Sequence, residues 1–268
     1  MLFGFHNRGS QTSPHPVLRS IVRDRAMAFV ILRRPRLSIG SLVRRSFGRH
    51  ERFISERYRR IFVDLDEFVS SIRAQIRAAG TILEIGCGDG MVTERIVHTF
   101  PDAAVTGIDI CAHPGRLYCG ERSNVRFLRT TAQDLAAAEP GRYHLVIIAD
   151  VLHHVPDPKW PDFLSAARHL RADGGTVVLK DWVRQPTVAY LLGYLSDRYV
   201  TGERIRYPYE RELRTLAQET FGASSIESEF RVRPWSCNLA LVIAPPRSQR
   251  NLSEHNQSEG AHSQAAEL

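Results

Sequence analysis

Cysteine pairs, long apolar runs and a recognisable secretory leader are all missing from this 268-residue chain. The four cysteines form no C-x-x-C pair, so the usual spacing of a zinc site is absent. The longest apolar stretches, 26–32 and 187–195, are far shorter than the ~20 residues that a membrane-spanning helix needs. We therefore expect no metal site, a reduced cytoplasmic setting and no membrane span.

Positive charge is concentrated at one end of the chain. The net charge is +7, and residues 1–60 hold 14 arginines, no lysine and three acidic residues, so this leader is strongly basic and the remainder is mildly acidic. Such an arm suits a peripheral membrane contact or nucleic acid, but it is equally typical of a solvated surface or of an organelle transit peptide. All four interpretations stay open.

The organising pattern is the stretch 81–90, TILEIGCGDG. An apolar run is followed by Gly86, Gly88 and Gly90, and a helical pattern starts at Met91. Glycines let backbone N–H groups approach a ligand closely and adopt the unusual φ values of a strand-to-helix turn. The stretch therefore predicts a small-molecule site on this turn.

The residues around the turn restrict the ligand. The dinucleotide pattern G-x-G-x-x-G fails, because Met91 stands where its third glycine should be. Glu84 and Asp89 would repel a pyrophosphate but suit a ligand with cationic groups. Asp109 ends the next strand, where a carboxylate can accept hydrogen bonds from ribose hydroxyls. A cationic nucleoside such as S-adenosylmethionine fits these features.

Strands and helices alternate through the body of the chain, as in βαβ units. The apolar runs LVIIA and TVVL are typical of parallel strands that are buried on both faces. We expect a first helix near 17–32 and a long one over about 51–78. The expected strands are 82–86, 104–109, 125–128, 144–149, 176–180, 225–233 and 238–244, and the further helices are 91–99, 113–121, 160–171 and 209–220.

Five motifs in this order resemble a class I S-adenosylmethionine-dependent methyltransferase: ILEIGCGDG, VTGID, AQDL, YHLVIIADVLHHV and LRADGGTVVLKD. The resemblance covers about 81–245. It implies an α/β, Rossmann-like fold with a seven-stranded, mostly parallel sheet, an antiparallel last strand and helices on both faces. We divide the chain into a basic extension (1–50), the methyltransferase domain (51–246) with a substrate-covering insertion (182–207), and a disordered tail (247–268).

The resemblance also assigns the cofactor site. In such enzymes the motif acid anchors the amino end of the ligand, the acid after the second strand binds the ribose, and the loop after the third strand receives the adenine. Structural roles compete for Asp89 and Asp134, each of which could cap a helix. The implied cofactor-binding residues are Glu84, Gly86, Cys87, Gly88, Asp89, Gly90, Asp109, Ile110, Gln133, Asp134, Asp150 and Val151.

His153, His154 and Asp181 are the candidate catalytic residues. A neutral histidine can accept a proton from a hydroxyl as the methyl group arrives, and adjacent residues point in different directions, so at most one histidine should face the acceptor. Packing in the cofactor pocket is the alternative role. Asp150 and Asp181 invite comparison with catechol-type magnesium-dependent methyltransferases, but Trp182 replaces the expected asparagine, so we expect no metal.

Motifs that the sequence lacks restrict the class of the methyl acceptor. The N/D-P-P-Y/F motif of amine-modifying nucleic-acid methyltransferases is replaced by ADVL, and the Pro-Cys pair of cytosine-carbon enzymes is lacking, so nucleic acid is an unlikely substrate. Aromatic residues of 182–207 are candidates for an acceptor pocket or for ordinary core packing. We expect O-methylation of a small-molecule, lipid-linked or glycan-linked acceptor. The alternatives are an RNA or protein methyltransferase and a non-catalytic scaffold.

Overall fold

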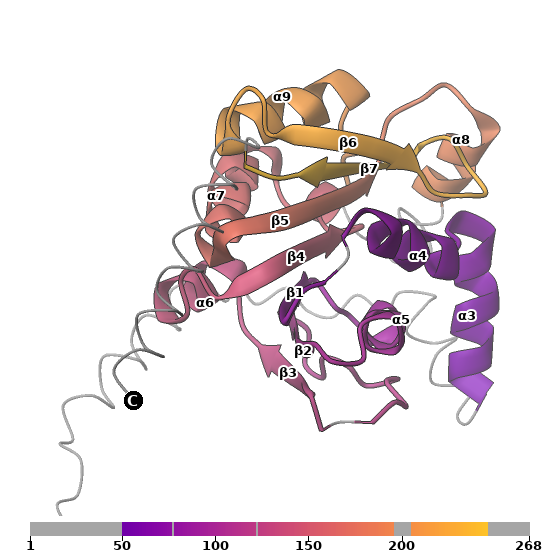
Figure 1. The fold of residues 1–268 in the computed structure, drawn as a ribbon. Helices are drawn as coiled ribbons and strands as arrows, with labels where there is room; N and C mark the ends of the chain where they lie inside the picture. The colour runs from indigo at the N-terminus through magenta and orange to yellow at the C-terminus, as the bar shows by residue number, and fades with distance from the viewer. Residues whose placement is uncertain (1–49, 77, 122, 196–204, 246–268) are drawn as a thin grey trace, which may run out of the picture. The chain divides into compact units, whose positions relative to one another are not determined.

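The computed structural model describes residues 50–76, 78–121, 123–195 and 205–245. Within these ranges a seven-stranded sheet is surrounded by helices (Figure 1). The strands are β1 (Thr81–Ile85), β2 (Ala104–Asp109), β3 (Val125–Arg129), β4 (Tyr143–Ala149), β5 (Arg171–Trp182), β6 (Ile226–Arg231) and β7 (Asn238–Ile243). The helices are α3 (Glu51–Phe62), α4 (Leu65–Gln75), α5 (Met91–Thr99), α6 (Ala132–Ala138), α7 (Trp160–Leu170), α8 (Val188–Leu195) and α9 (Glu210–Phe221).

The order of the strands is β3-β2-β1-β4-β5-β7-β6. β1 to β5 pair in parallel, whereas β7 lies antiparallel between β5 and β6. This confirms the expected Rossmann-like sheet and its antiparallel last strand. The strand order reverses between β1 and β4, and in open α/β sheets ligands bind outside the carboxyl ends of the strands at such a point.

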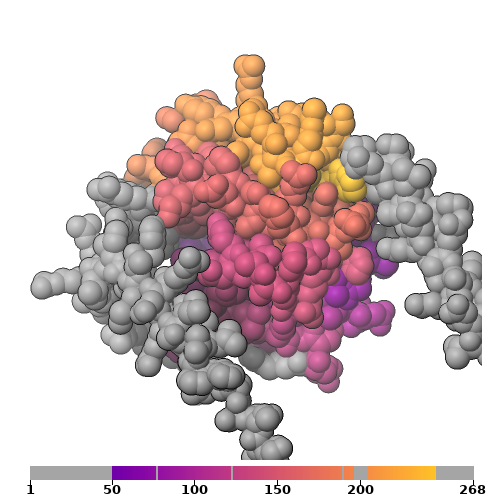
Figure 2. All heavy atoms as spheres, turned by 90° about the vertical axis from the view of Figure 1, so that its left-hand side faces the viewer, coloured from indigo at the N-terminus to yellow at the C-terminus, as the bar shows by residue number. Residues whose placement is uncertain are grey.

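Both faces of the sheet are covered, which explains the almost continuous apolar sequence of its central strands. Alternate residues of β4 enter different cores: Val146 and Ile148 pack with α6, α7 and α9, while Leu145 and Ile147 pack with α4 and α5. In Figure 2, which shows the side of the molecule away from α3 and α8, the atoms of α6, α7 and α9 follow one another from bottom to top.

The single helix expected over 51–78 is wrong, because the chain forms two helices there. Val63 is extended (φ −154°, ψ 135°), and the Asp64 side chain accepts a hydrogen bond from the Glu67 N–H at 2.9 Å and so caps α4. An N-cap carboxylate satisfies a backbone donor at a helix start and so allows a new helix to begin. The break lets α3 run in a different direction from α4 (Figure 1).

The helix expected over 113–121 is also wrong: this segment consists of turns and irregular chain. Its backbone is bound to the glycine turn instead, since the Gly115 N–H donates to the Gly88 carbonyl at 2.9 Å and the Leu117 N–H to the Asp89 carbonyl at 2.8 Å. Gly115 has φ +70° and lies against Phe127. A helix in this segment would require its backbone donors for its own ladder.

Two helices lie beyond the carboxyl ends of the central strands (Figure 1). The C-terminal part of α3 reaches β5 through Phe62, whose ring lies 5.9 Å from that of Trp182. Gly193 of α8 also lies against Trp182. The predicted insertion therefore contributes a helix at the edge of the sheet where the sequence places the ligand.

Several predictions fall on residues outside the described ranges: the helix near 17–32, the tail 247–268, Tyr199, and the extension 1–50 except His50. These stay predictions, as do the proposed domain boundaries. Within the described ranges, every helix is too short or too polar to cross a bilayer.

Candidate functional site

The three glycines of the turn all adopt positive φ values, +79° at Gly86, +51° at Gly88 and +88° at Gly90. The N–H groups of Gly86 and Cys87 both donate to the Ile108 carbonyl, which ties the turn to β2. A Cβ at Gly86 would lie 2.2 Å from Val151, whereas a Cβ at Gly88 would meet no atom within 4 Å. The turn is therefore closed on one side and open at Gly88, where a ligand can approach the backbone.

Asp109 lies at the end of β2, next to this open position. One carboxylate oxygen accepts from the Gly88 N–H and the other from the Cys111 N–H, both at 2.8 Å. Each carboxylate oxygen has a further lone pair for a ribose hydroxyl. Asp109 thus already holds the turn, and its ribose role stays a prediction. Its neighbour Ile110 is 73% exposed, as an apolar wall for a bound ring would be.

Glu84 is buried beneath the turn, so it is not a surface acid at a strand end. Its carboxylate accepts a 2.5 Å hydrogen bond from the Thr93 hydroxyl of α5. Burial raises the pKa of the Glu84 carboxyl to about 7, although the Thr93 hydrogen bond acts in the opposite direction. Glu84 therefore links β1 to the helix that follows the turn, and its charge depends on pH near neutrality.

Cys87 and Asp89 complete the turn in different ways. Burial, together with the nearby carboxylates, raises the pKa of the Cys87 thiol far above its ordinary range, which agrees with a packing role rather than a nucleophilic one. Asp89 forms an ion pair with Arg59 of α3 at 2.9 Å and accepts a long 3.3 Å hydrogen bond from the Met91 N–H. Arg59 was not anticipated from the sequence.

Ion pairs attach α3 to the rest of the site. Arg52 makes two hydrogen bonds to the Glu94 carboxylate of α5 and one to the Leu117 carbonyl. Glu51 pairs with Arg116, and Glu56 with Arg95. None of the residues of α3 is buried, so these ion pairs, together with the packing of Phe62 on Trp182, hold the helix in place. The Arg-rich sequence alone gave no indication of these partners.

Gln133 and Asp134 lie on the first turn of α6, and both side chains are exposed. Asp134 accepts a 2.7 Å hydrogen bond from the Thr131 hydroxyl, while the Thr131 oxygen accepts from the Asp134 N–H at 3.1 Å. Thr131, not Asp134, is the N-cap of this helix. Adenine contact by Asp134 stays a prediction.

Asp150 follows β4 with φ +57°, a left-handed conformation that is uncommon for a residue with a Cβ. Both of its carboxylate oxygens lie 2.6 Å from the Lys180 ammonium, and Lys180 is fully buried at the end of β5. The next residue, Val151, packs against Gly86. The Lys180–Asp150 pair is a feature that residue spacing could not reveal.

The two candidate histidines have different environments. His153 is buried, and its Nδ1 lies 2.6 Å from the fully buried Asp181 carboxylate, which also accepts the His153 and Trp182 N–H groups. Burial opposes ionisation of Asp181, but His153 and Lys180 outweigh it and lower the pKa of this carboxyl. His154 is exposed. The Tyr207 ring lies 5.0 Å from that of His153.

Aromatic residues of the insertion gather around His153. Tyr207 contacts the rings of Trp182 and Tyr190, at 6.0 and 5.6 Å between centroids. Tyr194 stacks on Tyr190 at 6.3 Å and is 37% exposed. The aromatic cluster thus has a buried part, Trp182 and Tyr207, that is ordinary core, and a more exposed part on α8. An acceptor pocket at the exposed part stays a prediction.

Asp150, His153 and Asp181 form a group whose ligand atoms all lie within 4.8 Å of one another. Such a set could hold a metal ion. The chain already supplies partners, however, because Lys180 engages Asp150, and His153 and Asp181 engage each other. That no metal binds here therefore stays a prediction. Its structural support is the Lys180 ammonium beside Asp150, not the replacement of asparagine by Trp182.

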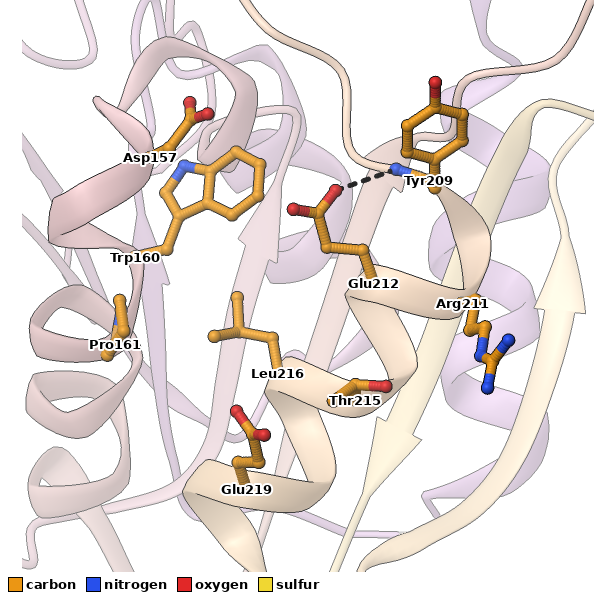
Figure 3. A pocket seen from close by; sticks show the side chains of 9 residues that line it. All are labelled: Asp157, Trp160, Pro161, Tyr209, Arg211, Glu212, Thr215, Leu216 and Glu219. Carbon is orange, nitrogen blue, oxygen red and sulfur yellow. Dashed lines mark hydrogen bonds between the residues drawn. The ribbon is translucent and has the colours of Figure 1, made fainter.

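A groove of about 720 Å³ lies elsewhere, between the start of α7 and one side of α9 along most of its length (Figure 3). Trp160 and Leu216 face each other across it, and the Glu212 carboxylate accepts the Tyr209 N–H. Its lining includes none of the predicted site residues. This groove is therefore separate from the glycine turn.

A family model described as a methyltransferase domain matches residues 53–223, more than half of the chain. The ubiquinone biosynthesis O-methyltransferase of Serratia proteamaculans is 34% identical over 124 residues, which cover 45% of this chain and 49% of that protein. The enzyme of the same name from Azotobacter vinelandii is 35% identical over 137 residues, covering 49% and 57%. The chain thus matches about half the length of these curated relatives.

Among solved structures, the chain is similar to the 1,6-didemethyltoxoflavin-N1-methyltransferase of Burkholderia thailandensis, which was crystallised with 1,6-didemethyltoxoflavin and S-adenosylhomocysteine. The TM-score is 0.53 at 16% identity, covering 88% of this chain and 91% of that one. At this identity the likeness shows the fold alone.

Proposed function

Since the chain belongs to the methyltransferase-domain family, we propose that it transfers a methyl group to an oxygen atom of a small-molecule acceptor. The methyl donor is S-adenosylmethionine. The observation that carries the proposal is the position of the buried His153–Asp181 pair at the same edge of the sheet as the acid-lined glycine turn. One group of residues can bind the cationic cofactor, while the other can accept a proton beside it.

In the proposed cofactor site the nucleoside lies over the open backbone at Gly88. Asp109 accepts the ribose hydroxyls while keeping its two backbone hydrogen bonds. Gln133 and Asp134 are placed to receive the adenine amino group, with Ile110 as an apolar wall. The carboxylates of Glu84, Asp89 and Asp150 favour the ammonium and sulfonium charges. The turn from Gly86 to Gly90, with Cys87 and Val151 packed beside it, supplies the floor of the site.

In the proposed reaction His153 accepts the proton of the acceptor hydroxyl as the oxygen takes the methyl group. Asp181 holds Nδ1 of the ring, so the proton goes to Nε2, and the ionised Asp181 stabilises the imidazolium. The carbon–sulfur bond of the donor breaks as the oxygen–carbon bond forms, which leaves S-adenosylhomocysteine. Alignment of the two reactants supplies most of the acceleration, up to ~7–11 kcal/mol in favourable cases.

The acceptor we propose has a planar ring and an apolar tail. The buried Tyr207 ring packs on His153, and the partly buried Tyr190 ring of α8 packs on Tyr207 in turn. Helix α8, which carries Tyr190, has no charged residue. Exposed apolar side chains extend along this helix: Val188, Leu191, Leu192 and Leu195. A ring docked on the tyrosines could place its tail along this apolar helix, consistent with relatives named for ubiquinone biosynthesis.

Contact with a membrane surface is part of this proposal. On α3, the exposed apolar residues Phe53 and Ile61 accompany arginines that could face acidic head groups. Sedimentation with liposomes of neutral or acidic lipid would test it, with Leu191→Ser/Leu192→Ser as the variant. Reduced binding by this variant supports the contact through α8. Deletion of residues 1–50 tests the basic leader in the same assay.

The reaction itself is tested with radiolabelled S-adenosylmethionine and cell extract, followed by separation of lipid, glycan, small-molecule and nucleic-acid fractions. The label is expected in the methyl ether of an organic-soluble hydroxyl compound. Label in RNA or protein would redirect the assignment of the acceptor. Binding of S-adenosylhomocysteine without turnover on any fraction would indicate a non-catalytic protein, whereas uptake of NADH or ATP in its place would refute the proposal.

A further inference from the structure

This chain has only two lysines, and one of them is buried near the carboxyl end of β5, beside the proposed catalytic residues. The sequence has 34 arginines but only Lys159 and Lys180. Lys159 is exposed, whereas Lys180 is fully buried. An ammonium group is costly to bury unless an opposite charge meets it. The use of lysine at this single buried position therefore calls for a specific partner.

That partner is Asp150. The Lys180 ammonium lies 2.6 Å from each of the two Asp150 carboxylate oxygens, and the Asp150 N–H donates to the Lys180 carbonyl at 3.0 Å. The pair is thus held both through side chains and through the backbone pairing that continues β4 and β5. A compact ammonium can approach both oxygens at once from within the core, where the wider guanidinium of arginine needs more room.

The Asp150 partner of Lys180 also has an uncommon backbone conformation. Within the described ranges, Asp150 is the one residue other than glycine with a positive φ. Such a conformation persists where the surroundings hold it, and it often occurs at functional sites. Val151, the next residue, lies against Gly86, so a shift of Asp150 would move the floor of the glycine turn. Lys180 is therefore linked to the cofactor site without facing it.

We propose that Lys180 is a built-in cation: a positioning residue that fixes Asp150 beside the glycine turn and occupies the place of a metal ion in the Asp150–His153–Asp181 group. The ligand atoms of that group all lie within 4.8 Å of one another, as atoms around one cation could, and Lys180 already supplies a positive charge beside Asp150. The positioning role of Lys180 rests on the proposed function, whereas its role in place of a metal ion can be tested by cation binding without measuring turnover.

The first test uses the wild-type protein labelled with ¹³C at lysine Cε, which gives two NMR signals. Mn²⁺ is added first: the Lys180 signal should be no more broadened than that of Lys159, which is the internal reference. Selective broadening of the Lys180 signal would overturn the proposal, because a metal would then share the site. S-adenosylhomocysteine is added next, and it should shift the Lys180 signal while the Lys159 signal stays in place.

The second test compares the variants Lys180→Met, Lys180→Arg and Lys159→Met. By electron paramagnetic resonance, folded Lys180→Met should gain one Mn²⁺ site that the added substitution Asp150→Asn removes, while Lys159→Met should gain none. Lys180→Met should weaken S-adenosylhomocysteine binding about tenfold, and Lys180→Arg should restore part of it. Folded Lys180→Met that binds no Mn²⁺ and retains wild-type affinity would overturn the proposal. If Lys180→Met does not fold, the wild-type NMR test decides.

The two proposals fail in different ways. If calorimetry detects no S-adenosylhomocysteine binding to the wild-type protein, the proposed function fails, and the Mn²⁺ measurements still decide whether Lys180 occupies a cation position. If the ligand binds and the Lys180 signal does not move at saturation, the proposed function survives and the positioning role of Lys180 is wrong.

Discussion

Two regions meet at the edge of the sheet where we propose that catalysis takes place, a proposed cofactor side and a proposed acceptor side, and different kinds of charge pair hold them together. On the cofactor side, α3 is attached to the glycine turn and α5 through pairs such as Arg52–Glu94 and Arg59–Asp89, whose side chains are 18–33% exposed. On the acceptor side, His153–Asp181 is 5% and 0% exposed. Solvated pairs contribute ~0.2–1 kcal/mol each, whereas breaking a buried pair costs ~3–5 kcal/mol.

This difference suggests a division of labour. On the proposed cofactor side, loss of one exposed pair should change the free energy only slightly. On the proposed acceptor side, His153 and Asp181 depend on one another, so a change in either partner should have a large effect. Four predictions, in decreasing order of effect, test this contrast.

The largest effect is expected from His153→Ala. If His153 is the general base, kcat should fall by ~10²–10⁴-fold while S-adenosylhomocysteine affinity changes little. The matched control is His154→Ala, which removes the exposed neighbour and should leave kcat within a few-fold. Steady-state kinetics with calorimetry measures both. Equal losses in the two variants would contradict the assignment of the base.

The pH dependence of stability should reveal Glu84. The pKa of Glu84 is about 7 in the folded protein, above the ordinary 4.5. Between pH 4.5 and pH 7 this carboxyl is therefore protonated in the folded state and ionised in the unfolded state. Stability should therefore fall as the pH rises from 4.5 through 7, by about 3 kcal/mol in total from this group. Glu84→Gln should remove this decline in chemical denaturation experiments.

A second acid provides the control for that experiment. The hydrogen bond from Arg126 lowers the pKa of the Glu139 carboxyl, so its contribution is present above the ordinary pKa and is lost as the pH falls. Glu139→Gln should therefore change the profile only on the acidic side, with the opposite sign. A decline that persists in Glu84→Gln would mean that another group causes it.

A smaller loss is expected from Asp109→Ala. Removal of a charge-assisted ribose contact worth ~1.5–3 kcal/mol should weaken S-adenosylhomocysteine binding about 10- to 100-fold in calorimetry. Asp102→Ala, a change in an exposed acid before the same strand, should have no effect. Because Asp109 also holds the Gly88 N–H, thermal unfolding of the variant must be recorded beside the affinity. Wild-type affinity would refute the ribose assignment.

The smallest effect should come from the pairs of α3. Arg59→Met should change cofactor binding by no more than a few-fold at low salt, because the loss of an anchor of α3 and the release of the Asp89 carboxylate toward a cationic ligand act in opposite directions. The difference from wild type should shrink as salt screens the Asp89 charge. Arg57→Met changes an exposed arginine of the same helix and should behave like the wild type. A salt-independent loss of more than tenfold would show that Arg59 contacts the ligand itself.

Patterns within short stretches predicted much of this protein. The alternation of apolar strands and helices gave the order of elements, and the buried runs of β4 and β5 indicated strands covered on both faces. The helix predictions failed where capping or tertiary hydrogen bonds outweighed the local helical pattern. The stretch VDLDEF predicts continuous helix, but its Asp64 caps a new one. In 113–121, the Gly115 and Leu117 N–H groups bond the glycine turn instead of forming a helix.

The sequence by itself determined the position of the turn, since glycines that must adopt positive φ are visible one residue at a time, as are the acids around them. Only the tertiary structure decided which charged groups meet. Asp150 finds Lys180, and His153 finds Asp181, because parallel pairing of β4 with β5 brings residues 30 and 28 positions apart to one edge. Spacing along the chain carries no trace of such contacts, since their partners are chosen by strand register and by the need to neutralise buried charge.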